Sequence, residues 1–293
     1  MAGSADLLPT DVPAPRRRRR PLLAGVGAAV AAAAVVGGLL VGGSGHHAAH
    51  LAGADIAALA RGAEGKMVAL KSSKVDFTMT MTVKGHDLSG GGTGAFDYVN
   101  RDGELAMTIE PIGTLNEIMT PDAMYLQLPE SERAAVAAET GGRSWLEISF
   151  AAIAKQTGVD LSALMQQQGG QDPASSLRLL AQAGSFHLVG TEPVRGVMTT
   201  HYSGTVDLAA AMRQKSTDLA ATNRVLKDYS STHVPVDVWL DADGVPRRMT
   251  QTLSMKTPGT MTMSMEFYDF GAPVSVVAPP ANDVYDAGQA LGG

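Results

Sequence analysis

Residues 75–83 of the chain read VDFTMTMTV, in which every second side chain is apolar and the intervening ones are polar. Residues 261–267 read MTMSMEF and alternate in the same way. Successive side chains of a β-strand point to opposite faces, so a period of two predicts strands with one apolar and one polar face. We therefore expect both stretches to lie in a sheet that faces a core on one side and water on the other.

The same alternation recurs along most of the chain. It predicts further strands at residues 96–98, 105–109, 124–128, 145–148, 186–194, 197–206, 234–240 and 245–255. Turns are predicted between these strands, at the glycine-rich residues 85–94, at NRDG (100–103) and at DADG (241–244). Helical spacing of apolar residues predicts helices at 54–71, 160–168, 173–183 and 207–229.

The pattern of the strands indicates the fold class. Strands with one wet face, joined by short turns, are typical of antiparallel sheets, whereas parallel sheets are covered on both faces. The apolar face has to be covered, and the predicted helices are few, short and rich in alanine. We therefore predict an α+β, mainly β fold, in which a curved antiparallel sheet (a half-barrel) has its concave apolar face covered by helices.

The predicted apolar face is rich in methionine, of which the chain contains 15. Methionine is flexible and polarizable, and it suits surfaces that accept ligands of variable shape. One interpretation of this face is an ordinary packed core, and the other is a hollow that holds acyl chains. For the second, the predicted lining residues are Phe77, Met79, Met81, Val83, Leu105, Met107, Ile109, Met124, Leu126, Val236, Val238, Met249, Leu253, Met261, Met263, Met265 and Phe267.

Metal binding receives little support from the sequence. The chain has no cysteine, which excludes disulfides and thiolate ligands. Met-x-Met pairs at 79–81 and 261–265 could bind Cu(I), but side chains two residues apart on a strand are rooted roughly 6.8 Å apart. No histidine lies in those strands, and the DADG turn lacks the final glutamate of a calcium loop. We predict no metal site, and copper remains the less favoured alternative.

Catalysis receives no support either. No nucleophile elbow, Walker loop, His-Glu-x-x-His motif or dinucleotide fingerprint occurs. His187, His201 and His233 are expected to be exposed strand residues beside no paired carboxylate. We therefore predict a protein that is not an enzyme, with no catalytic residues and no cofactor.

The N-terminal residues are predicted to attach the protein to a membrane. A basic tail (residues 1–21) ends in five consecutive arginines and is followed by an uncharged apolar run at 22–45. Such a run is long enough to cross a bilayer, and the arginines place the N-terminus in the cytoplasm. We expect a single-pass signal-anchor, a linker at 46–54 and a main domain outside the cytoplasm. The alternative is a signal peptide cleaved near Ala52–Ala54, which would release a secreted protein.

The remaining charge distribution limits the possible partners. The chain has a net charge of −6 and no basic stripe outside the arginine run, which argues against binding of nucleic acid. Residues 288–293 are expected to be a flexible C-terminus.

Several motifs in the second half of the chain resemble a known family. They are Asp172-Pro173 with Leu177, Leu179 and Leu180, then GTEPVRGV (190–197), HYSGTVD (201–207), VDVWLD (236–241) with Gly244 and Arg247-Arg248, and YDFG (268–271) with Pro273-Val274. In order and spacing the chain resembles the actinobacterial LppX/LprG-type lipoproteins, which share the fold of the LolA and LolB carriers. The resemblance covers residues 55–287.

The resemblance implies a non-enzymatic domain at 55–287 that binds lipids or acylated molecules in an apolar cavity. Members of that family are tethered by a lipidated cysteine, which this chain lacks, so the segment at 22–45 would replace it. The leading hypothesis is a membrane-tethered extracytoplasmic carrier or presenter of a lipid or acylated ligand. The alternative is an envelope sensor or interaction module with a protein partner that the sequence does not name.

Overall fold

The computed structural model of the chain describes residues 66, 69–83, 86–110, 113–152, 184–210, 219–257 and 259–287. The predicted basic tail, signal-anchor, linker and C-terminal residues lie outside these ranges, as do the helices predicted at 160–168 and 173–183. Among the residues that are described, no helix is both long enough and apolar enough to cross a membrane.

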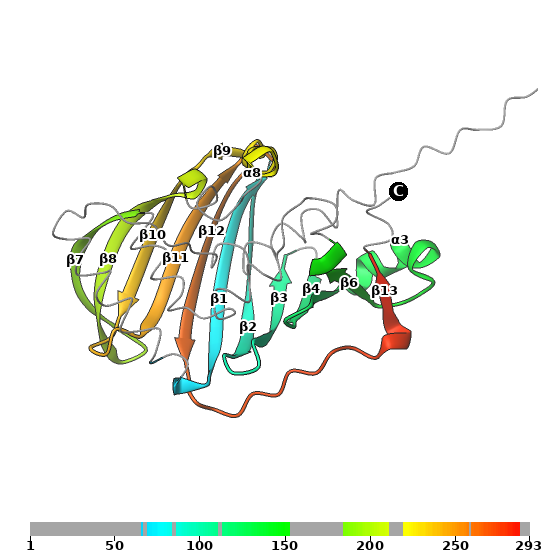
Figure 1. The fold of residues 1–293 in the computed structure, drawn as a ribbon, viewed down its shortest axis with the longest axis horizontal. Coiled ribbons are helices and arrows are strands. Elements are labelled where there is room, and N and C mark those ends of the chain that lie inside the picture. Colours follow the sequence, from blue (N-terminus) through cyan, green and yellow to red (C-terminus); the bar gives the residue numbers. More distant parts are fainter. Residues whose placement is uncertain are drawn as a thin grey trace, which may run out of the picture.

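One sheet of 13 strands dominates the described residues (Figure 1). Its first half is formed by β1 (Ser72–Val83), β2 (His86–Asp97), β3 (Asp102–Ile109), β4 (Gly113–Met119), β5 (Ala123–Gln127) and β6 (Trp145–Ser149), with helix α3 (Glu130–Thr140). Its second half is formed by β7 (Gly184–Val194), β8 (Val197–Asp207), β9 (Tyr229–Ser231), β10 (His233–Leu240), β11 (Pro246–Met255) and β12 (Thr260–Tyr268), with helix α8 (Leu219–Leu226). A short 3₁₀ helix (Ala281–Asp283) and β13 (Val284–Asp286) end the described chain.

The order of the strands joins distant parts of the sequence. From one edge to the other they lie in the order β13, β6, β5, β4, β3, β2, β1, β12, β11, β10, β8, β7, while β9 pairs with β11. The two halves of the chain meet where β1 pairs with β12. The strand pairs are antiparallel except for β13 with β6. The predicted mainly β class is therefore confirmed, whereas the sheet, predicted to be antiparallel, is mixed because β13 pairs with β6 in parallel.

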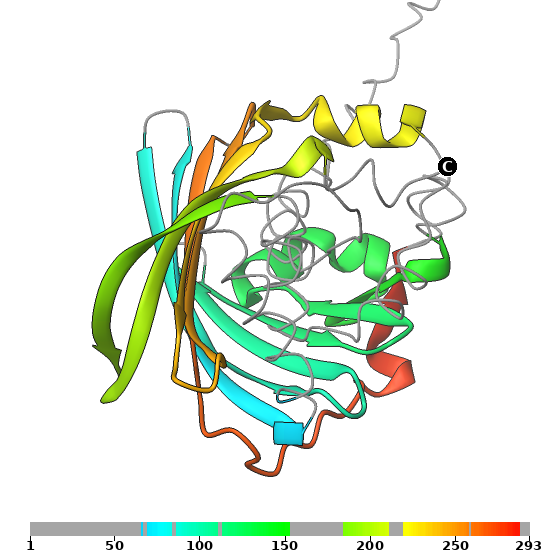
Figure 2. The ribbon, with the colours of Figure 1, turned by 60° about the vertical axis from the view of Figure 1, so that its left-hand side comes forward.

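The sheet is strongly curved. Figure 2 shows β3 to β6 and α3 turning away from the long strands β1 and β10 to β12. Glycines in β2 allow this curvature: a Cβ added at Gly92 would lie 1.8 Å from the carbonyl oxygen of Ala106, and one at Gly94 would lie 2.4 Å from that of Glu104. Glycine inside a strand is typical of such close approaches at the bends of curved sheets.

The alternation predicts which side of the sheet is buried. In β1 the side chains of Val75, Phe77, Met79 and Met81 are at most 5% exposed, and the side chains between them point to the other face. Burying apolar side chains of this size contributes roughly 1.5–3 kcal/mol each, so this face is the main stabilising surface of the fold. We call it the inner face, and we call the opposite one the outer face.

Some local predictions are wrong. The glycine-rich residues predicted as a turn form most of strand β2, and Tyr229, predicted to end a helix, begins strand β9. Strand β4 and helix α3 were not predicted, because their sequences, GTLNEIM and ESERAAVAAET, have only weak apolar periodicity.

Candidate functional site

The residues predicted to line a hollow lie together on the inner face. All of them except Val83, whose side chain is not described, belong to one buried hydrophobic cluster. The most exposed of them, Leu105 and Ile109, are only 7% exposed, and Leu126 and Leu253 are completely buried. The structure therefore brings the predicted residues together and closes their face to solvent.

Methionines from three neighbouring strands form the middle of this face. Met79 lies directly opposite Met263, and Met81 lies opposite Met261, across the β1–β12 pair. Met265 lies opposite Met249 across the β11–β12 pair. Directly opposed side chains have Cβ atoms roughly 4.5–5.5 Å apart, closer than neighbours along one strand. The methionines thus lie close together on this face, although Gln251 of β11 opposes Met263. No group of His, Asp or Glu suited to a metal ion occurs among the described residues.

The inner face extends beyond the predicted set. Further buried members of the same cluster are Val75, Phe96, Leu115, Met119, Leu146, Ile148, Phe186, Val206, Val234 and Leu240. Most of them occupy alternate strand positions, so the same period-two pattern identifies them once the strand boundaries are known.

One carboxyl group interrupts the inner face. Glu117 lies between Leu115 and Met119 in β4, opposite Leu105 of β3 and Leu126 of β5, and is 4% exposed. Its Oε1 atom has no hydrogen-bond partner, and no ion pair joins the carboxyl to a described residue. Burial raises the pKa of this carboxyl to about 8, because desolvation disfavours its charged form.

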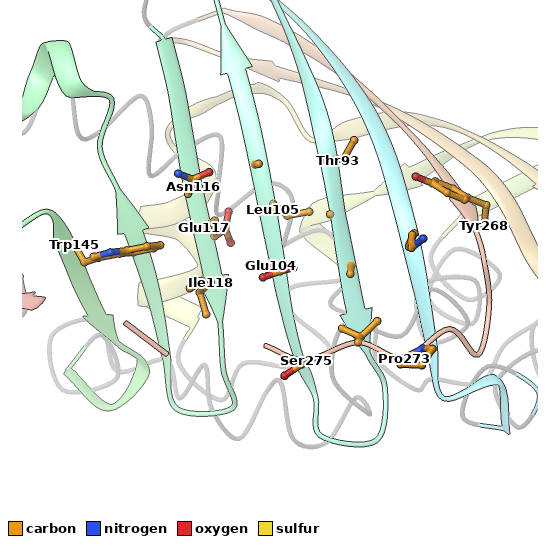
Figure 3. Close-up of a pocket in the computed structure, with 15 residues that line it drawn as sticks. Thr93, Glu104, Leu105, Asn116, Glu117, Ile118, Trp145, Tyr268, Pro273 and Ser275 are labelled. Atoms are coloured by element: carbon orange, nitrogen blue, oxygen red, sulfur yellow. The ribbon is translucent and has the colours of Figure 1, made fainter. Parts of the chain in front are cut away.

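The outer face carries a groove of mixed polarity with a volume of about 620 Å³. Figure 3 shows Trp145 and Tyr268 at its two sides, with Asn116 and Glu104 between them. The extended segment that contains Pro273 forms part of its wall. Charged and polar side chains, among them Lys74, Glu104 and Asn116, lie along this groove.

Ion pairs on the outer face join the two halves of the sheet. Arg195, in the β7–β8 turn, donates from Nε to Glu266 of β12 at 2.8 Å and from Nη2 to Asp76 of β1. Its guanidinium lies 4.0 Å from the centre of the Tyr268 ring. Arg248 of β11 also pairs with Glu266. This network connects the turn between β7 and β8 to the paired strands β1 and β12.

One histidine differs from its predicted environment. His201 was expected to lie beside no carboxylate, but its Nε2 is 3.0 Å from Asp237 and its Nδ1 is 3.6 Å from Glu192. Its ring stacks on Trp239 with 4.1 Å between centroids. The error arises because these carboxylates belong to neighbouring strands, which the local sequence does not identify.

Comparison with known proteins gives distant relatives. No protein-family model matches the chain. An uncharacterized 31.2 kDa protein from the rplA-rplJ intergenic region of Streptomyces griseus is 33% identical over 161 residues, which cover 54% of this chain. The matched region spans about half of that relative, 52% of its length. A Streptomyces coelicolor protein named "Putative lipoprotein SCO4650" is 27% identical over 237 residues, covering 75% of this chain and 71% of that protein.

Solved structures of lipoproteins are also similar to this chain. The crystal structure of Mycobacterium tuberculosis lipoprotein LppX matches with a TM-score of 0.46 and 13% identity, covering 76% of this chain and 99% of LppX. LprF from Mycobacterium bovis matches with a TM-score of 0.40 and 14% identity, covering 78% of this chain and 98% of LprF. These comparisons find the similarity to LppX-type lipoproteins that the sequence motifs indicate. This chain contains no cysteine.

Proposed function

We propose that this chain is a non-enzymatic extracytoplasmic protein that binds a lipid or an acylated molecule against the inner face of its sheet. The observation that carries the proposal is the methionine-rich, mostly apolar surface shared by β1, β11 and β12. Each buried methylene group of an acyl chain contributes about 0.8 kcal/mol, so a surface of this extent can hold a long chain by apolar contact alone. The relative named as a lipoprotein supports an envelope location.

The inner face is closed in this structure, so a ligand has to displace side chains as it enters. Methionine has three rotatable bonds and no branch, which makes such repacking less costly than for leucine or isoleucine. In this proposal the curved sheet acts as a half-barrel, and the acyl chain lies against its concave inner face.

We further propose that residues 22–45 tether the domain to the membrane with the N-terminus in the cytoplasm. The chain has no cysteine to carry a lipid anchor, and the apolar run follows five arginines. The mass of the mature protein decides between this tether and the secreted alternative. A chain that begins at its own first residue supports the tether, whereas one that begins near Ala54 contradicts it.

The lipid-binding proposal is tested on the full chain purified from its membrane fraction. Native mass spectrometry and organic extraction should detect bound acyl lipid. Met263→Asp should reduce the lipid content severalfold, because an ionised carboxylate on the inner face repels an acyl chain. Thr262→Asp is the matched control, since Thr262 is adjacent but opposes Thr80 and Thr252 on the outer face.

Wild-type protein without lipid would contradict the proposal whatever the variants do. A membrane protein that co-purifies with lipid-free chain would favour the interaction module instead. If Met263→Asp and Thr262→Asp lose lipid equally, the lipid is not held by the inner face.

A further inference from the structure

Strand β4 places a carboxyl group inside a mostly apolar surface, on which Gln251 of β11 also takes an inward position opposite Met263. Glu117 follows the same inward direction as Leu115 and Met119, and its cross-strand neighbours are Leu105 and Leu126. All four neighbours are at most 7% exposed, so the carboxyl group is enclosed by aliphatic and thioether side chains. Glu104, on the outer face of the adjacent strand, is exposed and provides a direct contrast.

The enclosed carboxyl makes no compensating contact with the described residues. Its Oε1 atom has no hydrogen-bond partner, and no Lys or Arg among the described residues pairs with it. Buried polar groups in folded proteins are nearly always hydrogen-bonded, and an unpaired one weakens the fold. An apolar side chain at this position would fit its neighbours better. The packing of the sheet therefore does not explain why a glutamate stands here.

A carboxyl held in apolar surroundings at neutral pH is mostly protonated, since its pKa is raised to about 8. In that form it offers one O–H donor and one carbonyl acceptor. The matching ligand group is neutral and both accepts and donates, as a hydroxyl or an amide does. A charged headgroup is disfavoured here, because burying an ion costs far more than burying a hydroxyl.

We propose that Glu117 is a polar contact of the inner face, hydrogen-bonding a neutral hydroxyl or amide group on an otherwise apolar ligand. This inference rests on the proposed lipid-binding function. The aliphatic side chains around Glu117 hold the hydrocarbon part, and the carboxyl fixes the position of the one polar group along the sheet. Ligand selection then depends on where that group stands on the acyl chain.

The test compares 1-dodecanol with 1-chlorododecane, which have the same chain length, although only the alcohol donates a hydrogen bond. Both probes are titrated calorimetrically into the full chain as wild type, Glu117→Gln and Glu117→Met. One net hydrogen bond corresponds to a preference of about fivefold. We expect wild type and Glu117→Gln to prefer the alcohol by that factor. Glu117→Met should lose the preference and bind the chloroalkane at least as tightly as wild type does.

Controls separate the possible failures. Glu104→Met, the same change on the outer face, should leave both affinities unchanged. If wild type and Glu117→Met bind both probes alike, the role of Glu117 is wrong while the lipid-binding function stands. If wild type binds neither probe, the lipid-binding function fails and this inference fails with it. A stronger affinity for dodecylamine that disappears in Glu117→Gln would replace the neutral contact with an ion pair.

Discussion

Among the residues that the structure describes, Glu117 is the one whose folding is most clearly coupled to protonation. Burial raises the pKa of its carboxyl from 4.5 to about 8, so the folded chain keeps a proton that the unfolded chain releases. The stability associated with this proton is fully present below about pH 4.5 and is lost as the pH rises to about 8. We expect the free energy of unfolding to fall by up to roughly 1 kcal/mol per pH unit across that window.

Urea unfolding of the full chain near both ends of this window measures the effect. The glutamine of Glu117→Gln cannot ionise, so this variant should lose most of the pH dependence of the free energy of unfolding. Glu104→Gln, on the outer face, should keep the pH dependence of wild type. An equally steep dependence in Glu117→Gln would assign the titration to another group.

The same residue shows what alternation along the sequence leaves undetected. Residues 113–119 place Leu115, Glu117 and Met119 at inward positions, but the central glutamate breaks the apolar pattern by which strands are recognised. The inner-face residues that were predicted lie in strands whose apolar positions alternate more regularly than those of β4. A glutamate at an inward position interrupts the period-two pattern of apolar residues. Strand β4 and the burial of Glu117 are therefore recognised only in the folded structure.

Among the elements, strand β2 shows most clearly why local composition can mislead. A run of glycines favours turns, because glycine adopts conformations that other residues avoid. In β2 the glycines serve a different need: their missing Cβ atoms let the backbone of β3 approach closely. The close approach depends on strand β3, so the sequence of β2 alone does not predict it.

We expect Gly92→Ala to destabilise the protein by about 2 kcal/mol or more, because the new Cβ would lie 1.8 Å from the carbonyl oxygen of Ala106. Thermal and urea unfolding measure the change. Gly190→Ala is the matched control in an edge strand, since a Cβ there meets no atom within 4 Å. Its effect should stay within about 0.5 kcal/mol. Equal effects of the two substitutions would refute the close approach of β2 and β3.

At the scale of the whole molecule, the sequence predicts the mainly β class and the composition of the inner face, but not the strand order. The alternation of apolar and polar residues predicts which face of the sheet a side chain occupies. It does not predict which strands are neighbours. The pairing of β1 with β12 was not predicted and is seen only in the structure, where Phe77 opposes Met265 and Met79 opposes Met263. Long-range ion pairs, such as that between Arg195 and Asp76, are hidden for the same reason.

Arg195 provides a test of how the two halves hold together. Arg195→Gln should lower the free energy of unfolding by roughly 1 kcal/mol at low salt, and by less at high salt, because the pairs are partly exposed and screened. Arg195→Lys should restore only part of it, since an ammonium cannot bind Glu266 and Asp76 as the guanidinium does.

The control for this test is Arg143→Gln, because Arg143 is exposed and its guanidinium contacts the backbone carbonyl of Thr140. Its salt dependence should match that of wild type. An Arg195→Gln variant with unchanged stability at low salt would show that the hairpin tip is held by packing alone.

The pairing of β1 with β12 also has a consequence for the timing of biosynthesis. Strand β1 ends at Val83, and its partner begins at Thr260, so ribosomes must synthesise the whole intervening chain first. At usual rates of elongation that takes on the order of ten seconds or more. During this interval β1 exposes a free edge and an apolar flank, which are the features that promote aggregation. The nascent protein is therefore most prone to aggregate before strand β12 has been synthesised.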